Sequence, residues 1–275
     1  MRSPILFALL FANTSALADC PSLARDLHTR WSARQPFDVP VLTHGEATCI
    51  QRQFEQLLEA EHGAPVGYKA GLTNPVVRQQ FGADAPLRGT LFGRFLLEGG
   101  AEVSASFGAR PVVEADLLVV VRSSELMKAK TRAEALAGLS AVVPFIELPD
   151  LVAADPKTLK ATGIQAINVG ARLGVRGRPV TEFTEASLGA MAVTLERDGA
   201  VVAEGRGSDL MGHPLDVVLW LVESLAADGR ALKAGDILSL GTLGRPVPPV
   251  AGATFTARYS GLGDVSVRFA ADTRP

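Results

Sequence analysis

The chain is poor in aromatic and cysteine residues, and neither sign of charge dominates it. Of its 275 residues only 6% are aromatic and two are cysteine, while 27 lysine and arginine residues face 29 aspartate and glutamate residues. A balanced charge without a long basic run argues against a nucleic-acid partner. The low aromatic content argues against a surface that stacks sugars. The chain does have a hydrophobic fraction of 47%, enough for one sizeable buried core.

The first 18 residues have the pattern of a secretory signal peptide. Arg2 gives a short positive start, residues 5–12 form an apolar stretch, and residues 16–18 are Ala-Leu-Ala, a small-residue cleavage motif. The apolar stretch is too short to span a bilayer. Cleavage after Ala18 would leave Asp19 as the first residue, and an Asp directly before Cys20 argues against a lipidated cysteine. We therefore expect a periplasmic or secreted protein with no membrane attachment after cleavage.

Residues 19–62 are predicted to form a helical N-terminal segment that contains both cysteines. Apolar residues recur every three or four positions around Cys20 and Cys49, and Thr43 with Glu46 fits a capping box for the second helix. An oxidising compartment would let the two cysteines pair. A disulfide here would stabilise the fold by roughly 3–4 kcal/mol on the chain-entropy model. Two unpaired, buried thiols are the alternative.

Beyond this segment, residues 63–275 are predicted to form an α+β domain in which short strands dominate. Strands are expected at residues 66–72, 91–97, 112–121, 236–240, 253–259 and 265–270, and helices at 133–142 and 215–227. Asp198-Gly199 suits the tight turn of a hairpin between residues 192–197 and 200–206. This order of elements predicts a mainly antiparallel or mixed sheet and not a repeated βαβ array.

Two carboxylates interrupt the most apolar of these strands. Glu114 and Asp116 are separated by one residue in Pro-Val-Val-Glu-Ala-Asp-Leu-Leu-Val-Val-Val, so both side chains project from the same face. Burying two like charges together is costly unless a cation or a proton compensates them. Glu147 lies in a second apolar run, and no His or Cys is near, so these acids suit Mg²⁺ or Mn²⁺ better than Zn²⁺. The alternative is an ordinary half-buried strand with its acids at the edge.

Six motifs follow one another in an order that resembles a known enzyme group. They are Gly67-Tyr-Lys-Ala-Gly-Leu-Thr73, Gly89-Thr-Leu-Phe92, Glu114-Ala-Asp116, Glu147, Gly205-Arg-Gly-Ser-Asp-Leu-Met-Gly-His-Pro-Leu215 and Ala234-Gly-Asp-Ile-Leu-Ser-Leu-Gly-Thr-Leu-Gly244. This series resembles the 2-keto-4-pentenoate hydratase and 4-oxalocrotonate decarboxylase group of the fumarylacetoacetate hydrolase superfamily. The resemblance covers residues 67–269. It implies that 63–275 is a fumarylacetoacetate-hydrolase-like catalytic domain, a mixed β-roll with flanking helices, in a homo-oligomer.

The resemblance also implies roles for the matched residues. Glu114, Asp116 and Glu147 would hold a divalent cation, Mg²⁺ or Mn²⁺, with Asp in place of the family's middle Glu. Lys69 would bind the substrate, a small 2-oxo acid, or transfer a proton to it. Three further residues would line the substrate site: Asn168, Gly241 and Thr242. Three others match the family but are interpreted as structural residues before the helix at 215–227, namely Arg206, Ser208 and His213.

The chain departs from the family pattern where relatives carry an acid beside the substrate. In Gly82-Ala-Asp-Ala-Pro-Leu-Arg88, Leu87 takes the place of that acid, and Asp84 survives as a candidate catalytic residue. In a second segment, acid-rich in relatives, only Asn168 matches. Leucine cannot move a proton, so we expect hydration to be weak or absent. Decarboxylation of a 2-oxo diacid is expected to suffer less, because a metal can stabilise the charge that develops.

These features favour an exported, metal-dependent lyase, a hydratase or a decarboxylase, that acts on a small 2-oxo acid such as 2-oxopent-4-enoate or a 2-oxo diacid. Lys69, Asp84 or a water on the metal would have to move the protons. One alternative is an exported protein that binds metal and 2-oxo acid without turnover. Another is a hydrolase of C–C bonds in diketo acids, although no His is convincingly placed as its base.

Overall fold

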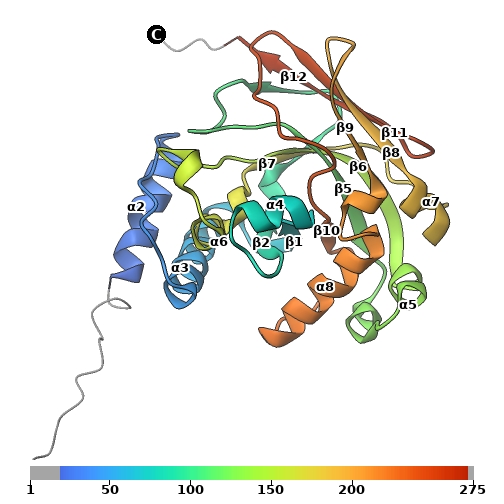
Figure 1. Cartoon of the computed structure of the whole chain (residues 1–275), viewed down its shortest axis with the longest axis horizontal. Coiled ribbons are helices and arrows are strands. Elements are labelled where there is room, and N and C mark those ends of the chain that lie inside the picture. The colour runs from blue at the N-terminus through green and yellow to red at the C-terminus, as the bar shows by residue number, and fades with distance from the viewer. Residues whose placement is uncertain (1–18, 272–275) are drawn as a thin grey trace, which may run out of the picture.

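Two β-sheets form the centre of the molecule, and helices pack around them (Figure 1). The computed structural model describes residues 19–271, so the expected signal peptide, residues 1–18, lies outside the described part. The larger sheet contains β1 (Pro65–Gly71), β2 (Leu87–Phe92), β3 (Leu96–Glu98), β5 (Glu114–Val121), β6 (Leu139–Leu148), β7 (Leu173–Arg176) and β10 (Ile237–Ser239). Their order across the sheet is β2-β1-β10-β5-β6-β7-β3.

The smaller sheet lies on the side of the molecule opposite the N-terminal helices (Figure 1). Its order is β4-β12-β11-β8-β9, with β4 at Ala101–Ser104, β8 at Ala192–Arg197, β9 at Ala200–Arg206, β11 at Thr254–Tyr259 and β12 at Gly263–Ala270. Asp198 and Gly199 take φ angles of 50° and 83° between β8 and β9, which confirms the predicted hairpin. Parallel pairs such as β1–β10 and β4–β12 accompany antiparallel ones. The predicted mixed α+β architecture is confirmed.

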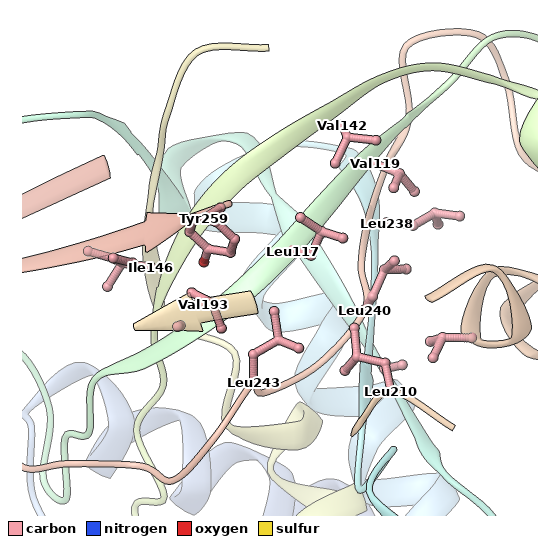
Figure 2. Close-up of a cluster of buried hydrophobic side chains, with 14 of the residues drawn as sticks. Leu117, Val119, Val142, Ile146, Val193, Leu210, Leu238, Leu240, Leu243 and Tyr259 are labelled. Carbon is pink, nitrogen blue, oxygen red and sulfur yellow. The ribbon is translucent and has the colours of Figure 1, made fainter. Parts of the chain in front are cut away.

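The main core lies against one face of β5. Successive residues of a strand point to opposite faces, so Leu117 and Val119 project to the same side, and both are fully buried. Figure 2 shows them among buried side chains from strands of both sheets, including Val142, Ile146, Val193, Leu238 and Tyr259. Each such side chain stabilises the fold by roughly 1.5–3 kcal/mol through burial. This core fixes β5 and β6 relative to each other and so positions the residues on their opposite face.

The predicted helical N-terminal segment is a pair of helices, α2 (Cys20–Ser32) and α3 (His44–His62), on one side of the molecule (Figure 1). Their buried residues share a hydrophobic cluster with Phe92 of β2 and with Phe95, which follows it. The two helices therefore pack directly on the large sheet.

Two local features of the helix pair agree with the sequence. The Thr43 hydroxyl accepts a hydrogen bond from the Glu46 amide, and the Glu46 carboxylate accepts one from the Thr43 amide, which is the predicted capping box. A disulfide joins Cys20 and Cys49, whose Cα atoms are 6.1 Å apart, within the range that such a bond requires. The described cysteines are thus both paired.

The other helices are short except for α8 (Pro214–Ala227). They are α4 (Pro75–Gln80), α5 (Arg132–Ala137), α6 (Ala161–Ala166) and α7 (Glu185–Ala190). The segment Gly207–Ala227, which includes α8, has a mean hydropathy of 1.3 over a membrane-length window, and half of that window is buried inside the protein. That burial is expected of a core helix, and the buried face of α8 belongs to the main core.

The limits of two predicted elements are wrong. The helix predicted at 133–142 ends at Ala137, and β6 begins at Leu139, because pairing with β5 overrides the helical preference of the alanine-rich stretch. The strand predicted at 91–97 is two strands, β2 and β3, separated by one turn of 3₁₀ helix at Gly93–Phe95. Glycine weakens a strand interior and commonly marks such an interruption.

Candidate active site

Two glutamates from adjacent strands face each other at one end of the β5–β6 pair. Glu114 begins β5, and its register partner on β6 is Glu147. Directly paired residues point to the same face of a sheet, so the two carboxylates lie side by side. Both are buried, with exposures of 8% and 4%. Neighbouring buried carboxylates repel each other, so this part of the fold requires either a compensating positive charge or protonation of a carboxylate.

Lys69 supplies one positive charge. It lies in β1, and the three-residue strand β10 lies between β1 and β5 in the sheet. Its ammonium group donates hydrogen bonds to the Glu147 carboxylate and, at 2.9 Å, to the backbone carbonyl of Val169. Because Lys69 is 3% exposed, these protein acceptors take the place of water around its charge. The structure therefore brings Lys69 into the site, as the sequence predicts.

Asp116 lies two residues after Glu114 on the same face of β5 and is fully buried. Its carboxylate accepts hydrogen bonds from the Ser239 hydroxyl at 2.6 Å, from the Gly241 amide at 2.9 Å and from the Leu117 amide. Gly241 has a φ angle of 107°, and a Cβ there would lie 2.5 Å from the Thr73 hydroxyl oxygen. Only glycine fits this position without strain. The turn after β10 is thus shaped to hold the Asp116 carboxylate.

The electrostatics of the group favour a cation. Burial, reinforced by the negative charge of Glu147, raises the pKa of Glu114 to about 7 and that of Asp116 to about 8. The Thr242 hydroxyl donates a hydrogen bond to the Glu114 carboxylate, which favours its charged form. The three carboxylates outnumber the single ammonium of this region, that of Lys69, and a divalent cation would neutralise the excess negative charge. Carboxylate oxygens are the ligands that Mg²⁺ and Mn²⁺ prefer, so the residues fit such an ion by charge and donor chemistry.

The side-chain geometry differs from the predicted convergence. Within residues 19–271, no group of three or more His, Cys, Asp or Glu side chains lies close enough to hold a metal ion. Glu114 and Glu147 line a common cavity, whereas Asp116 is fully buried and does not line it. An Asp is one methylene shorter than the Glu of the family pattern, and Ser239 and Gly241 already occupy its oxygens. The prediction that all three carboxylates meet at one point is therefore not confirmed by this structure.

The cavity has a volume of about 170 Å³ and is lined by two kinds of residue. Its polar lining contains two hydrogen-bonded pairs, Lys69 with Glu147 and Thr242 with Glu114, together with Thr73 and Asn74. Its apolar part includes Leu72, Phe81, Leu151, Ile164 and Val169, which pack together in one hydrophobic cluster. Pockets for drug-sized ligands measure roughly 300–1,000 Å³, so this cavity suits a smaller molecule. A cavity with charged and apolar parts can bind a small acid and orient it.

Comparison with known proteins assigns this arrangement to a family. Residues 93–270 match the model of the fumarylacetoacetate (FAA) hydrolase C-terminal domain. The chain belongs to the fumarylacetoacetate hydrolase family. A 2-keto-4-pentenoate hydratase of Burkholderia vietnamiensis is 31% identical to it over 228 residues, which cover 82% of this chain and 87% of the relative. A 4-oxalocrotonate decarboxylase of Pseudomonas putida is 29% identical over 232 residues, covering 84% of this chain and 88% of the relative.

Solved structures agree with the family assignment. The 4-oxalocrotonate decarboxylase from Pseudomonas putida G7, complexed with magnesium and adipate, superposes with a TM-score of 0.83 at 27% identity. The match covers 92% of this chain and 97% of the decarboxylase. A second structure of that enzyme, complexed with calcium and acetate, gives a TM-score of 0.81 at 28% identity, with the same coverage. The resemblance to the hydratase and decarboxylase group and the fumarylacetoacetate-hydrolase-like fold are confirmed.

Two of the family positions expected to contact substrate lie behind the cavity wall. Asn168 is fully buried, and its side chain accepts a hydrogen bond from the Thr90 amide at 2.7 Å and donates one to the Thr90 carbonyl at 3.0 Å. Gly241 donates to Asp116 and is not among the described residues that line the cavity. Asn168 instead fixes the backbone before Val169, whose carbonyl binds Lys69. We therefore interpret Asn168 and Gly241 as positioning residues, while Thr242 does line the cavity.

The two residues of the departing segment also lie outside the cavity lining. Asp84 is exposed on the loop before β2, so its predicted part in proton transfer finds no support in this geometry. Leu87 packs against the apolar cluster that contains Val169 and Phe81. The leucine that replaces the family's acid therefore belongs to the apolar side of the site.

The residues before α8 have the structural character expected from the sequence. The His213 Nδ1 atom accepts a hydrogen bond from the Leu215 amide at 3.1 Å, and its Nε2 atom lies 3.0 Å from the Glu185 carbonyl oxygen. Arg206 and Ser208 are exposed and do not line the cavity. Sequence reasoning missed Ser239, although it is the single polar residue in Ile-Leu-Ser-Leu and so carried a signal.

Proposed function

We propose that this protein is a divalent-cation-dependent lyase that hydrates or decarboxylates a small 2-oxo acid. The observation that carries the proposal is that three buried ionisable residues line the polar part of a small cavity: Glu114, Glu147 and Lys69. Relatives that cover most of the chain, named as hydratases and decarboxylases, support the same class of reaction. A buried ammonium beside carboxylates, open to a ligand cavity, provides both charge and exchangeable protons for such chemistry.

Glu114 and Glu147 are the residues that would hold the cation, with Asp116 as the third carboxylate of the group. A bound divalent cation supplies Lewis acidity, which stabilises negative charge that develops on a substrate oxygen. The Thr242 hydroxyl orients the Glu114 carboxylate through its hydrogen bond. Lys69, held by Glu147 and Val169, can bind the substrate carboxylate or give a proton to a substrate carbon.

The reaction is tested with purified mature protein, Mg²⁺ and two substrates, 2-oxopent-4-enoate and a 2-oxo diacid, with products identified by NMR. We expect turnover that is lost with EDTA. Removing the ammonium group in Lys69→Met should lower kcat by about 10²–10⁴-fold, as the loss of a positioned proton donor does. Turnover that is insensitive to EDTA, or unchanged in Lys69→Met, would contradict the proposal.

Cation binding is tested separately by calorimetry on the wild type, Glu114→Gln and Asp116→Asn. We expect Glu114→Gln to abolish Mg²⁺ binding. If Asp116 supplies an oxygen, Asp116→Asn weakens Mg²⁺ binding as well. If its role is to hold the turn through Ser239 and Gly241, Asp116→Asn lowers stability and leaves the affinity for Mg²⁺ nearly unchanged.

A second candidate is a protein that binds metal and 2-oxo acid without turnover. It is favoured by the apolar Leu87 and by the exposed position of Asp84, which leave Lys69 as the single basic side chain among the described cavity residues. Binding of pyruvate with Mg²⁺, together with no product from either substrate, would support it over the lyase. A C–C bond hydrolase has less support, because no His is among the described residues that line the cavity.

We further propose that the protein is exported and acts as a homo-oligomer in the periplasm or outside the cell. The disulfide between Cys20 and Cys49 and the signal-peptide pattern support export, since disulfides persist in oxidising compartments. Family resemblance supports the oligomer. N-terminal sequencing of protein from cell fractions should give Asp19 as the first residue, and light scattering should give a multiple of the monomer mass. An intact leader on cytoplasmic protein would contradict export.

A further inference from the structure

The apolar part of the cavity is formed by side chains of a single hydrophobic cluster. Leu72, Phe81, Leu151, Ile164 and Val169 line it and belong to one hydrophobic cluster. Val169 joins the two parts of the cavity, because its carbonyl binds Lys69 while its side chain belongs to the apolar cluster. A 2-oxo acid whose head group lies beside Lys69, Glu114 and Glu147 would therefore direct its tail toward these side chains.

Positive charge is absent from that apolar part. Among the described residues that line the cavity, Lys69 is the single cationic side chain, and it belongs to the polar part. Arg78 donates to the Leu72 carbonyl at 3.3 Å, and Arg88 donates to the Ser224 carbonyl at 2.6 Å and to Asp228. Neither arginine lines the cavity. A second carboxylate at the tail of a substrate would find no cation to pair with.

Leu87 adds a further apolar side chain around this part of the cavity. It packs against the same cluster from β2 and so sits behind the wall that would contact the tail. The replacement of an acid by leucine, seen in the sequence as a loss of proton-transfer capacity, is in the structure a gain of apolar surface around the site. The structure thus adds a second consequence of Leu87, an apolar environment around this part of the site, to the loss of proton transfer expected from the sequence.

We propose that the cavity selects 2-oxo monoacids with a short apolar tail and rejects 2-oxo diacids of the same chain length. The inference rests on the proposed function and narrows its substrate class. A carboxylate moved from water to an apolar wall without a partner loses its hydration without compensation. We therefore expect the diacid to bind at least about 100-fold more weakly than the matched monoacid at neutral pH.

The test is calorimetric competition, in the presence of Mg²⁺, between 2-oxohexanoate and 2-oxohexanedioate, with pyruvate as a ligand that has the head group and almost no tail. The expected result is tighter binding of 2-oxohexanoate than of pyruvate, and weak or absent binding of the diacid. Equal binding of the two six-carbon acids, with pyruvate also bound, would overturn this inference and leave the proposed function standing. No binding of any of the three would contradict the proposed function itself.

Two neighbouring variants locate the selectivity. Val77 of α4 lines the cavity and is 38% exposed, so an arginine there can direct its guanidinium toward the tail. Val76, the preceding residue, is 66% exposed and does not line the cavity, which makes it the matched control. We expect Val77→Arg to reduce the preference for the monoacid by about tenfold or more, since an ion pair becomes available to the diacid, and Val76→Arg to leave it unchanged. A preference that is unaltered in Val77→Arg, or equally reduced in both variants, would contradict the assignment of selectivity to the apolar wall.

Discussion

The two faces of β5 are both buried, yet they differ in what burial does to them. One face carries Ala115, Leu117 and Val119, which belong to the main hydrophobic core. The other begins with Glu114 and Asp116, whose burial raises the pKa of each carboxyl. Removing apolar side chains from water stabilises the fold, whereas removing carboxylates from water destabilises it.

The two faces of β5 have different roles: one stabilises the fold and the other carries ionisable residues of the site. Packing of the apolar face holds β5 in place within the core. This packing offsets the unfavourable free energy of burying the two carboxylates on the opposite face. Pairs of titratable groups in such surroundings are common at functional sites. Substitutions on the carboxylate face should therefore affect mainly activity. Substitutions on the apolar face should affect mainly stability.

The largest expected effect follows from Glu114→Gln, which keeps the shape of the ionisable face and removes one charge. We expect kcat/KM to fall by at least about 10³-fold, because a lost cation ligand removes several kcal/mol of transition-state stabilisation. In EDTA the melting temperature should stay the same or rise, since a buried carboxylate has been neutralised. The control is Glu182→Gln, an exposed position outside the cavity, which should change neither quantity.

On the apolar face, Leu117→Ala should lower the free energy of unfolding by about 2–5 kcal/mol, because it leaves a cavity in a fully packed core. Denaturant unfolding measures this loss. Activity per folded molecule should stay within a few-fold of the wild type. A loss of activity as large as in Glu114→Gln would show that the two faces are not independent.

A smaller effect is expected behind the ionisable face, at Asn168→Ala. The change leaves the buried Thr90 amide and carbonyl without their partner, which costs about 1–3 kcal/mol. It also loosens the backbone that presents the Val169 carbonyl to Lys69, so we expect kcat to fall more than KM changes. Equal kinetics in Asn168→Ala and the wild type would reduce Asn168 to a purely structural residue.

The last effect is gradual and appears as a slope, at most about 1.4 kcal/mol per pH unit for each carboxyl, in the pH dependence of the cation-free protein. The pKa of Glu114 rises on folding from 4.5 to about 7, and that of Asp116 from 3.8 to about 8. The folded state therefore retains protons that the unfolded chain has lost, and stability falls as the pH rises through this window. Thermal unfolding in EDTA between these limits should show the decline, and Glu114→Gln should reduce it. A melting temperature that rises with pH in both proteins would contradict the raised pKa values.

Local sequence patterns predicted the structure reliably where the cause is itself local. The alternation of Glu114 and Asp116 with apolar neighbours placed both acids on one face of a strand. Thr43 with Glu46 and the Asp198-Gly199 turn are each determined by residues a few positions apart. The helix predicted at 133–142 was wrong beyond Ala137 because strand pairing, a long-range interaction, decided the conformation there.

Features that depend on distant segments could not be predicted in this way. The apolar wall combines residues such as Leu72, Phe81 and Ile164 from separate elements, and each of them looks like ordinary core in the sequence. The role of Val169 rests on a backbone carbonyl, which every residue has. The position of Asp116 beside Ser239 and Gly241 depends on the register of β10, which no local pattern determines.

Strand β10 has a consequence for the order in which the protein acquires its site as it folds. Its three residues pair on one side with β1 and on the other with β5, and they are made long after both. A Cβ on Gly67 would lie 1.9 Å from the Ile237 carbonyl oxygen, so the close contact of β1 with β10 requires glycine. Pairing of segments so far apart in sequence is slow, and it cannot begin before Ile237 is available to the folding chain. A chain that ends before that residue would contain Lys69, Glu114 and Glu147 but no strand to bring the lysine to the glutamates.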